Sequence, residues 1–163
     1  MIRDALPADL AQVVVIYNAS IPGRMATADL MPVSVAERRA WFEDFDPRRR
    51  PLWIFSRDEG SAPLGWLSVR SFYGRPAYAE TVEVGVYIDP SAQRQGIGRQ
   101  LLNHAIARAP ALGISTLLAF TFAHNGPSIA LFKGAGFKTW GDLPGVARLD
   151  GMRRDLLILG RPL

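Results

Sequence analysis

The sequence predicts an α/β (α+β) domain in which strands and helices alternate along a chain of 163 residues. Residues 81–88 place valines and an isoleucine on one face and Glu83, Gly85 and Tyr87 on the other, which is typical of a β-strand. Residues 101–106 place apolar side chains at helical spacing after a glycine-bearing turn. The apolar content of 48% is sufficient for one core, and no linker or repeat interrupts the chain, so we expect a single domain over residues 1–163.

Composition excludes several kinds of site and leaves the partner open. The absence of cysteine excludes a disulfide framework, a thiolate metal site and a cysteine nucleophile. The N-terminus does not resemble a signal peptide, and no run approaches the roughly 20 apolar residues of a membrane span, so we expect a cytoplasmic protein without a membrane partner. The net charge of +4 and the isoelectric point of about 10.0 suit an anionic ligand, either a nucleotide phosphate or nucleic acid.

The N-terminal part is expected to form a strand over residues 2–5 and then a helix that opens at Pro7. Residues 20–32 are expected to form a loop. Ser34 and Glu37 have the spacing of a capping box, which predicts the start of a second helix. The apolar side of the first helix would consist of Leu10, Val13, Val14 and Tyr17.

The remainder of the chain contains four further strand signals and one helix signal. Residues 52–56 and 64–72 are β-rich runs joined by turn-forming residues, which predicts antiparallel strands. The apolar run over residues 114–120 is consistent with a buried strand. Asn125 and the nearby proline predict the start of a short helix. Glycines punctuate the tail, and we expect the last strand over residues 156–159.

The most informative turn comprises residues 93–99, between a strand and a helix. Gly96 and Gly98 allow backbone N–H groups to converge on a phosphate at the positive end of a helix. The turn lacks the Gly-Lys-Ser/Thr of a Walker loop and the three spaced glycines of a dinucleotide-binding fingerprint. An anion-binding loop and a simple turn that needs glycine to start a helix both remain compatible with this pattern.

Two segments carry a resemblance to the GNAT superfamily of N-acetyltransferases. Gln-x-x-Gly-x-Gly at residues 93–98 resembles the superfamily's acetyl-CoA pyrophosphate motif, and Asn125 with residues 128–132 and Gly136-Phe137 is similar to its second signature. The resemblance implies a GNAT fold, with a central mixed, mostly antiparallel twisted sheet flanked by helices on both faces, and acetyl-CoA as cosubstrate without a metal. The residues that it assigns to acetyl-CoA are Val84, Gly85, Val86, Tyr87, Gln93, Arg94, Gln95, Gly96, Ile97, Gly98, Arg99, Asn125, Ser128 and Phe132.

The resemblance covers nearly the whole chain and points to one branch of the superfamily. Segments that contain Tyr17, Thr27, Arg38 and Glu83, together with residues 141–155, are similar to phosphinothricin and methionine sulfoximine acetyltransferases. This implies transfer of an acetyl group to the amino group of a small amino-acid-like molecule. It also implies a homodimer, with neither nucleic acid nor a membrane as partner.

Such a reaction needs a general base, because an alkyl amine with a pKa of about 10 is mostly protonated at neutral pH. Glu83 is the candidate, acting directly or through water, because it lies off the core face of its strand and matches the carboxylate with that role in the resembled enzymes. The alternative is a strand glutamate that faces solvent or pairs with an arginine. The resemblance assigns the developing oxyanion to backbone N–H groups of residues 84–87. Gly85 either leaves room for the thioester or marks a β-bulge.

No general acid is evident. Phe132 stands where the wider superfamily often has tyrosine, and a phenyl ring cannot donate a proton. A thiol with a pKa of roughly 8.5 can leave as thiolate, so an acid is dispensable. His124 is an alternative proton donor, and His104 on a helix is a further one.

The acceptor is expected to contact the loop that precedes the strand of Glu83. Arg75 in this loop is suited to bidentate contact with a carboxylate or phosphinate, and the alternative is an ordinary surface cation. Tyr73 and Tyr78 could form the pocket walls, and the resemblance adds Thr27.

Three other functions remain open at this point. The positive charge and Arg48-Arg49-Arg50 would suit a nucleic-acid-binding module, but we interpret the arginine run as solvated surface. Phe132 is also compatible with a GNAT protein that binds acetyl-CoA without turnover. Among enzymes, the alternative acceptors are a protein N-terminus, a lysine side chain or a polyamine.

Overall fold

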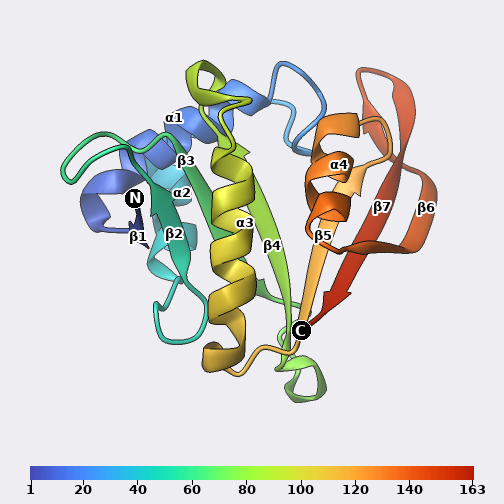
Figure 1. Ribbon diagram of the computed structural model, residues 1–163. Coiled ribbons are helices and arrows are strands. Elements are labelled where there is room, and N and C mark those ends of the chain that lie inside the picture. Colours follow the sequence, from blue (N-terminus) through green and yellow to red (C-terminus); the bar gives the residue numbers. More distant parts are fainter.

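A computed structural model describes residues 1–163 and shows a seven-stranded mixed sheet with helices on both faces (Figure 1). The strand order is β1-β2-β3-β4-β5-β7-β6, and all neighbouring pairs are antiparallel except β4 and β5. The expected mixed, mostly antiparallel sheet is therefore confirmed. The strands are β1 (Ile2–Asp4), β2 (Leu52–Phe55), β3 (Gly65–Ser71), β4 (Thr81–Ile88), β5 (Thr116–Phe122), β6 (Lys138–Leu149) and β7 (Met152–Pro162). The helices are α1 (Leu10–Ser20), α2 (Val35–Glu43), α3 (Ile97–Arg108) and α4 (Gly126–Gly134).

The core is divided between the two faces of the sheet. On one face, α3 and α4 cover an apolar cluster to which β4 contributes Val82 and Val84. On the other face, α1 and α2 cover a cluster around Trp66, whose indole N–H donates to the carbonyl oxygen of Val13 at 3.2 Å. The alternation of β4 sets this division, because its valines face α3 whereas Tyr87 packs against the cluster beneath α1.

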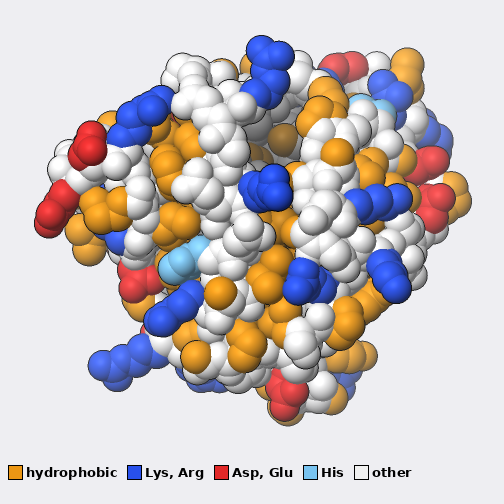
Figure 2. Space-filling view, viewed as in Figure 1, with side chains coloured by type: hydrophobic (Ala, Val, Ile, Leu, Met, Phe, Trp, Pro, Cys, Tyr) orange, Lys and Arg blue, Asp and Glu red, His pale blue; other side chains and the backbone are white.

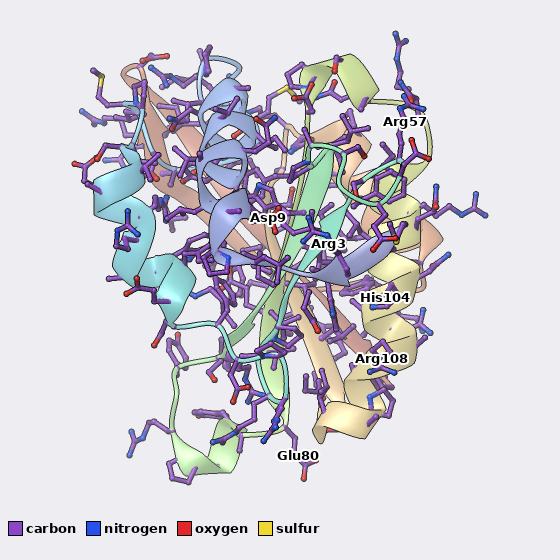
Figure 3. All side chains as sticks on the ribbon, turned by 90° about the vertical axis from the view of Figure 1, so that its left-hand side faces the viewer. Arg3, Asp9, Arg57, Glu80, His104 and Arg108 are labelled. Atoms are coloured by element: carbon purple, nitrogen blue, oxygen red, sulfur yellow. The ribbon has the colours of Figure 1, made fainter.

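The predicted starts of the first two helices are confirmed. The Ser34 hydroxyl accepts from the N–H of Glu37 at 3.1 Å, and the Glu37 carboxylate accepts from the N–H of Ser34 at 2.6 Å, which completes the predicted capping box. A short 3-10 turn at Pro7–Asp9 precedes α1, and there Arg3 of β1 forms an ion pair with Asp9 at 2.7 Å (Figure 3). No helix of the structure combines the length and apolar character needed to cross a bilayer.

The C-terminal tail differs from the expectation. β6 was not predicted, and β7 is longer than the expected strand over residues 156–159. The pairing of β6 with β7 shifts register near Gly141 and again after Leu143, and these irregularities break the alternation by which a strand is recognised. Pro144 is tolerated because β6 lies at the edge of the sheet. β5 likewise begins at Thr116, two residues later than the apolar run suggested.

β4 and β5 separate soon after they meet. Only residues 81–83 of β4 pair with residues 116–118 of β5. Beyond them the two strands diverge toward their C-terminal ends, leaving a gap in the middle of the sheet (Figure 1). Across this gap α3 and α4 approach closely, since a Cβ added to Gly98 would lie 3.3 Å from Cδ2 of Leu131.

Candidate active site

Glu83 lies at the point where β4 and β5 separate. It is the last β4 residue paired with β5, and its cross-strand partner on β3 is Arg70. The side chain is open to solvent, yet the surrounding residues displace part of its hydration, which raises its pKa, and the charge of Arg70 partly offsets this effect. No ion pair involves Glu83, so of the two alternatives to a catalytic role the structure contains the solvent-facing glutamate and not the one paired with arginine.

Beyond Glu83, β4 has one open edge. Residues 84–88 pair with β3 on one side and with no strand on the other, so backbone polar groups along the second edge face the gap. The side chains of Val84 and Val86 pack into the core beneath α3, which leaves their backbone for a ligand. The β3–β4 register continues through Gly85, so the β-bulge interpretation was wrong. A side chain there would crowd Ser68, since an added Cβ would lie 3.2 Å from its Oγ.

The predicted phosphate loop joins β4 to α3. Gly96 is the N-cap of α3 in the left-handed region, with φ of 77°, and Arg94 also has a positive φ of 59°. No side chain caps the helix, so its first N–H groups lack both an intrahelical and a side-chain acceptor. An added Cβ at Gly96 meets no atom within 4 Å, so the space outside this helix end is open. Free amides, open space and the positive helix end together fit a pyrophosphate.

Other members of the predicted acetyl-CoA set lie around this loop and at α4. Gln93, Gln95 and Arg99 are exposed, whereas the side chain of Ile97 is buried and leaves only its backbone accessible. The surface is hollowed between the N-terminal end of α3 and α4, with apolar side chains within the hollow and Lys and Arg around it (Figure 2). An apolar channel with a basic rim suits a long arm that carries phosphates at one end.

The loop between α1 and α2 crosses the gap on the opposite face. Carbonyl oxygens of residues 24–26 accept from the Tyr87 hydroxyl at 3.2 Å, the Asn125 amide at 3.0 Å and Nε2 of His124 at 2.8 Å. The loop therefore links β4 to the turn that follows β5. Nε2 of His124 is thus engaged with a backbone carbonyl oxygen, and its Nδ1 is buried without a hydrogen-bond partner.

A polar cluster fixes the same loop over the sheet. The Tyr17 hydroxyl is hydrogen-bonded to Thr27 Oγ1 at 2.6 Å and to Asp29. Arg38 pairs with Asp29 at 3.0 Å, and its guanidinium lies 4.4 Å from the centre of the Tyr17 ring. Burial raises the pKa of both Tyr17 and Tyr87, so both hydroxyls stay protonated. Thr27, predicted to contact the acceptor, thus uses its hydroxyl within the protein, and Asp29 was missed by the sequence analysis.

The residues predicted for the acceptor come from the β3–β4 loop. The Phe72 ring lies 4.3 Å from the ring of Tyr73 and 5.5 Å from that of Tyr78, and it stacks at 6.5 Å on Phe120 of β5. Tyr73 and Tyr78 are exposed and form an aromatic wall at this end of β4. Arg75 precedes the 3-10 turn Pro76–Tyr78, is exposed, and has no ion-pair partner.

A hollow of about 520 Å³ lies between the end of α2 and the β3–β4 loop. Arg50 does not belong to a fully solvated run as expected, because its guanidinium donates to Ser71 Oγ at 2.9 Å and to the Ala79 carbonyl oxygen at 2.7 Å. The side chains that line the hollow include Trp41, Tyr73, Arg49, Arg50 and Arg70. Arg70 lines this hollow and is also the cross-strand neighbour of Glu83. The sequence analysis had not identified Arg70 as a site residue.

Two predicted positions lie in packed surroundings. Phe132 is 4% exposed and packs edge-on against Phe137, with ring centres 5.1 Å apart. Ser128 offers its N–H to the Asn125 side chain at 3.1 Å, which caps α4 as predicted. His104 packs edge-on against Trp53 of β2, on the side of α3 away from the gap (Figure 3), and burial lowers its pKa.

Comparison with known proteins adds a family to this geometry. The chain matches the Acetyltransferase (GNAT) family over residues 20–137. It is 48% identical to YwnH of Bacillus subtilis (strain 168), a candidate phosphinothricin acetyltransferase, over 95% of this chain and 94% of the relative. It is 33% identical to the L-methionine sulfoximine/L-methionine sulfone acetyltransferase of Pseudomonas aeruginosa, over 97% and 91% of the two chains.

A solved structure agrees. The crystal structure of a GNAT superfamily phosphinothricin acetyltransferase from Sinorhizobium meliloti in complex with AcCoA is 32% identical, with a TM-score of 0.92, and the match covers 100% of this chain and 88% of that one. The chain therefore belongs to the GNAT family and is an acyltransferase. Within the family it is similar to phosphinothricin and methionine sulfoximine acetyltransferases, as the sequence motifs indicated.

Proposed function

We propose that this protein is an acetyl-CoA-dependent N-acetyltransferase that acts on the amino group of a small amino-acid-like acceptor, of the phosphinothricin or methionine sulfoximine type. The observation that carries the proposal is the position of Glu83, which lies where β4 and β5 separate and next to the open edge of β4. Its neighbour on β3 is Arg70, which lines the hollow between the end of α2 and the β3–β4 loop. The relatives named for these two reactions, and the related structure that holds AcCoA, support it.

Acetyl-CoA would lie along the gap and the start of α3. The uncapped first turn of α3 would hold the pyrophosphate, with Arg94 and Arg99 as exposed cations beside it. The open edge of residues 84–87 would hold the arm and donate a backbone N–H to the thioester oxygen. Asn125, Ser128 and Phe132 at the start and core side of α4 would border the other side of the arm.

Acetyl-CoA supplies the thioester, and the chain would supply a base. Glu83 would take a proton from the acceptor amine, directly or through water, while the nitrogen bonds to the carbonyl carbon and the C–S bond breaks. Because its pKa is raised, Glu83 holds a proton better than an ordinary carboxylate does. The thiol can leave as thiolate, in keeping with the packed, non-donating Phe132.

The acceptor would enter from the face of α1 and α2. Tyr73 and Tyr78 would form one wall, Arg75 would contact an acidic group, and Thr27 would act through the position of its loop. Three arginines and two aspartates line the nearby hollow, and this small excess of positive charge favours an anionic acceptor over a polyamine or a lysine side chain. The protein would act as a homodimer, with exposed apolar side chains of β6 and β7 such as Trp140 and Met152 at the interface.

A direct assay tests the proposal. Purified protein and acetyl-CoA are incubated with one amine per reaction, and thiol release and product mass are followed. The amines are phosphinothricin, L-methionine sulfoximine, L-methionine sulfone, a lysine peptide and spermidine. We expect thiol release and an acetylated product with at least one amino-acid acceptor. Tight acetyl-CoA binding without thiol release on any amine would instead support a catalytically silent protein, and a preference for the peptide or polyamine would overturn the acceptor class.

A further inference from the structure

Arg70 and Glu83 are oppositely charged neighbours on one face of the sheet that do not form an ion pair with each other. They are direct cross-strand partners on β3 and β4, and such partners have Cβ atoms about 4.5–5.5 Å apart. Both side chains are exposed, and neither takes part in an ion pair. Each therefore keeps its hydrogen-bonding capacity for an external group.

The surroundings of Arg70 make it the cation best placed beside Glu83. Arg50 is held by Ser71 and the Ala79 carbonyl oxygen, so its guanidinium is already used. Arg49 lines the same hollow from the loop after α2. Asp44 and Asp46 line it as well, so the hollow is not uniformly positive. Of these groups, Arg70 alone stands on the strand next to Glu83.

We propose that Arg70 and Glu83 together recognise the α-carboxylate and the α-amino group of the acceptor, so that Arg70 selects α-amino acids over other small amines. The inference rests on the proposed function and names a specificity residue for it. An α-amino acid carries its two charged groups on one carbon atom, which matches two side chains that stand next to each other. The guanidinium offers parallel N–H donors to a carboxylate, while Glu83 accepts from the amine.

This assignment separates the tasks of two arginines. Arg70 is fixed on a paired strand and would read the α-carboxylate, which every amino acid has. Arg75 lies in the β3–β4 loop and would reach an acidic group on the acceptor side chain. A simple alkyl amine would engage Glu83 alone and would gain nothing from Arg70.

The test compares L-methionine sulfone with its carboxamide, two acceptors that differ in the charge of the carboxyl group. Steady-state kinetics are measured for the wild type, Arg70→Gln, Arg70→Lys and the control Arg48→Gln, which removes an exposed arginine outside the hollow. We expect Arg70→Gln to lower the acid-to-amide ratio of kcat/KM about tenfold to a hundredfold, mainly through KM for the acid, as removal of a charged hydrogen-bond partner does. Arg70→Lys should fall between, and Arg48→Gln should keep the wild-type ratio.

A second readout separates recognition from folding. Because the charge of Arg70 lowers the pKa of Glu83, Arg70→Gln should move the acidic inflection of kcat/KM to higher pH. An equal loss on acid and amide, with an unmoved inflection, would overturn the inference. So would a wild type that acetylates both acceptors equally well, which would leave the N-acetyltransferase proposal intact. A wild type that binds acetyl-CoA and acetylates none of the amines of the direct assay would overturn both.

Discussion

Replacement of Gly96 gives a quantitative test of the anion-binding loop. Gly96→Asp and Gly96→Asn introduce side chains of nearly the same size at a residue with φ of 77°, and both types tolerate this conformation better than most. They differ by one negative charge at the end of α3. Two unit charges about 4 Å apart repel by about 1 kcal/mol in water and about 4 kcal/mol near a protein surface. The site is exposed with no atom within 4 Å of the added Cβ, so the lower half of this range applies.

We therefore expect Gly96→Asp to bind acetyl-CoA about 1–2 kcal/mol more weakly than Gly96→Asn, or roughly fivefold to thirtyfold in Kd. Isothermal titration calorimetry measures both variants, with circular dichroism as the check on folding. Raising the ionic strength from about 0.05 M to 1 M should reduce the difference, because salt screens exposed charges. Equal affinities for two folded variants at low salt would refute the assignment of the pyrophosphate to this loop.

Three further predictions concern the acceptor side and stability. Arg75→Ala should raise the KM for acidic acceptors several-fold with kcat largely kept, and unchanged steady-state kinetics would make Arg75 a surface cation. Tyr17→Phe should lower the free energy of unfolding by about 0.5–1.5 kcal/mol in urea titrations and raise the acceptor KM, because the loop bearing Thr27 loses an anchor. Glu83→Gln should have a higher Tm than the wild type at neutral pH, because the raised pKa of Glu83 means that its charged form is less stable in the folded protein than in the unfolded chain. The difference in Tm should vanish in acid, where Glu83 is protonated in both states.

Local patterns were sufficient to predict the parts of the site that lie on one continuous segment. The alternation of β4, the glycine turn and the start of α3 are contiguous in sequence, and the structure has each of them where it was expected. The capping box at Ser34 and the cap at Asn125 depend on neighbours three residues away and were predicted for the same reason. Features that depend only on residues close together in the sequence can therefore be predicted without knowledge of the fold.

Features that depend on register between distant segments were not predicted. Arg70 stands opposite Glu83 only because β3 and β4 pair in one register, which no local pattern fixes. Asp29 acquires its role through Tyr17 and Arg38, on two different helices. β6 was missed because the register shifts near Gly141 and after Leu143 break its alternation, so its residues have the pattern of a glycine-rich loop. Gly85 was ambiguous for the same reason, and the continuous register resolved it.

The pH dependence of kcat/KM for the wild type and Glu83→Gln tests the central claim most directly. Loss of a positioned base typically costs about 10² to 10⁴ in rate, so the variant should lose that much near neutral pH while it binds acetyl-CoA normally. The deficit should shrink as the pH rises toward the amine pKa of about 10, because a growing share of the acceptor is already neutral. A deficit that is uniform across pH would mean that Glu83 acts through position or charge, and a loss below about threefold would contradict a catalytic role altogether.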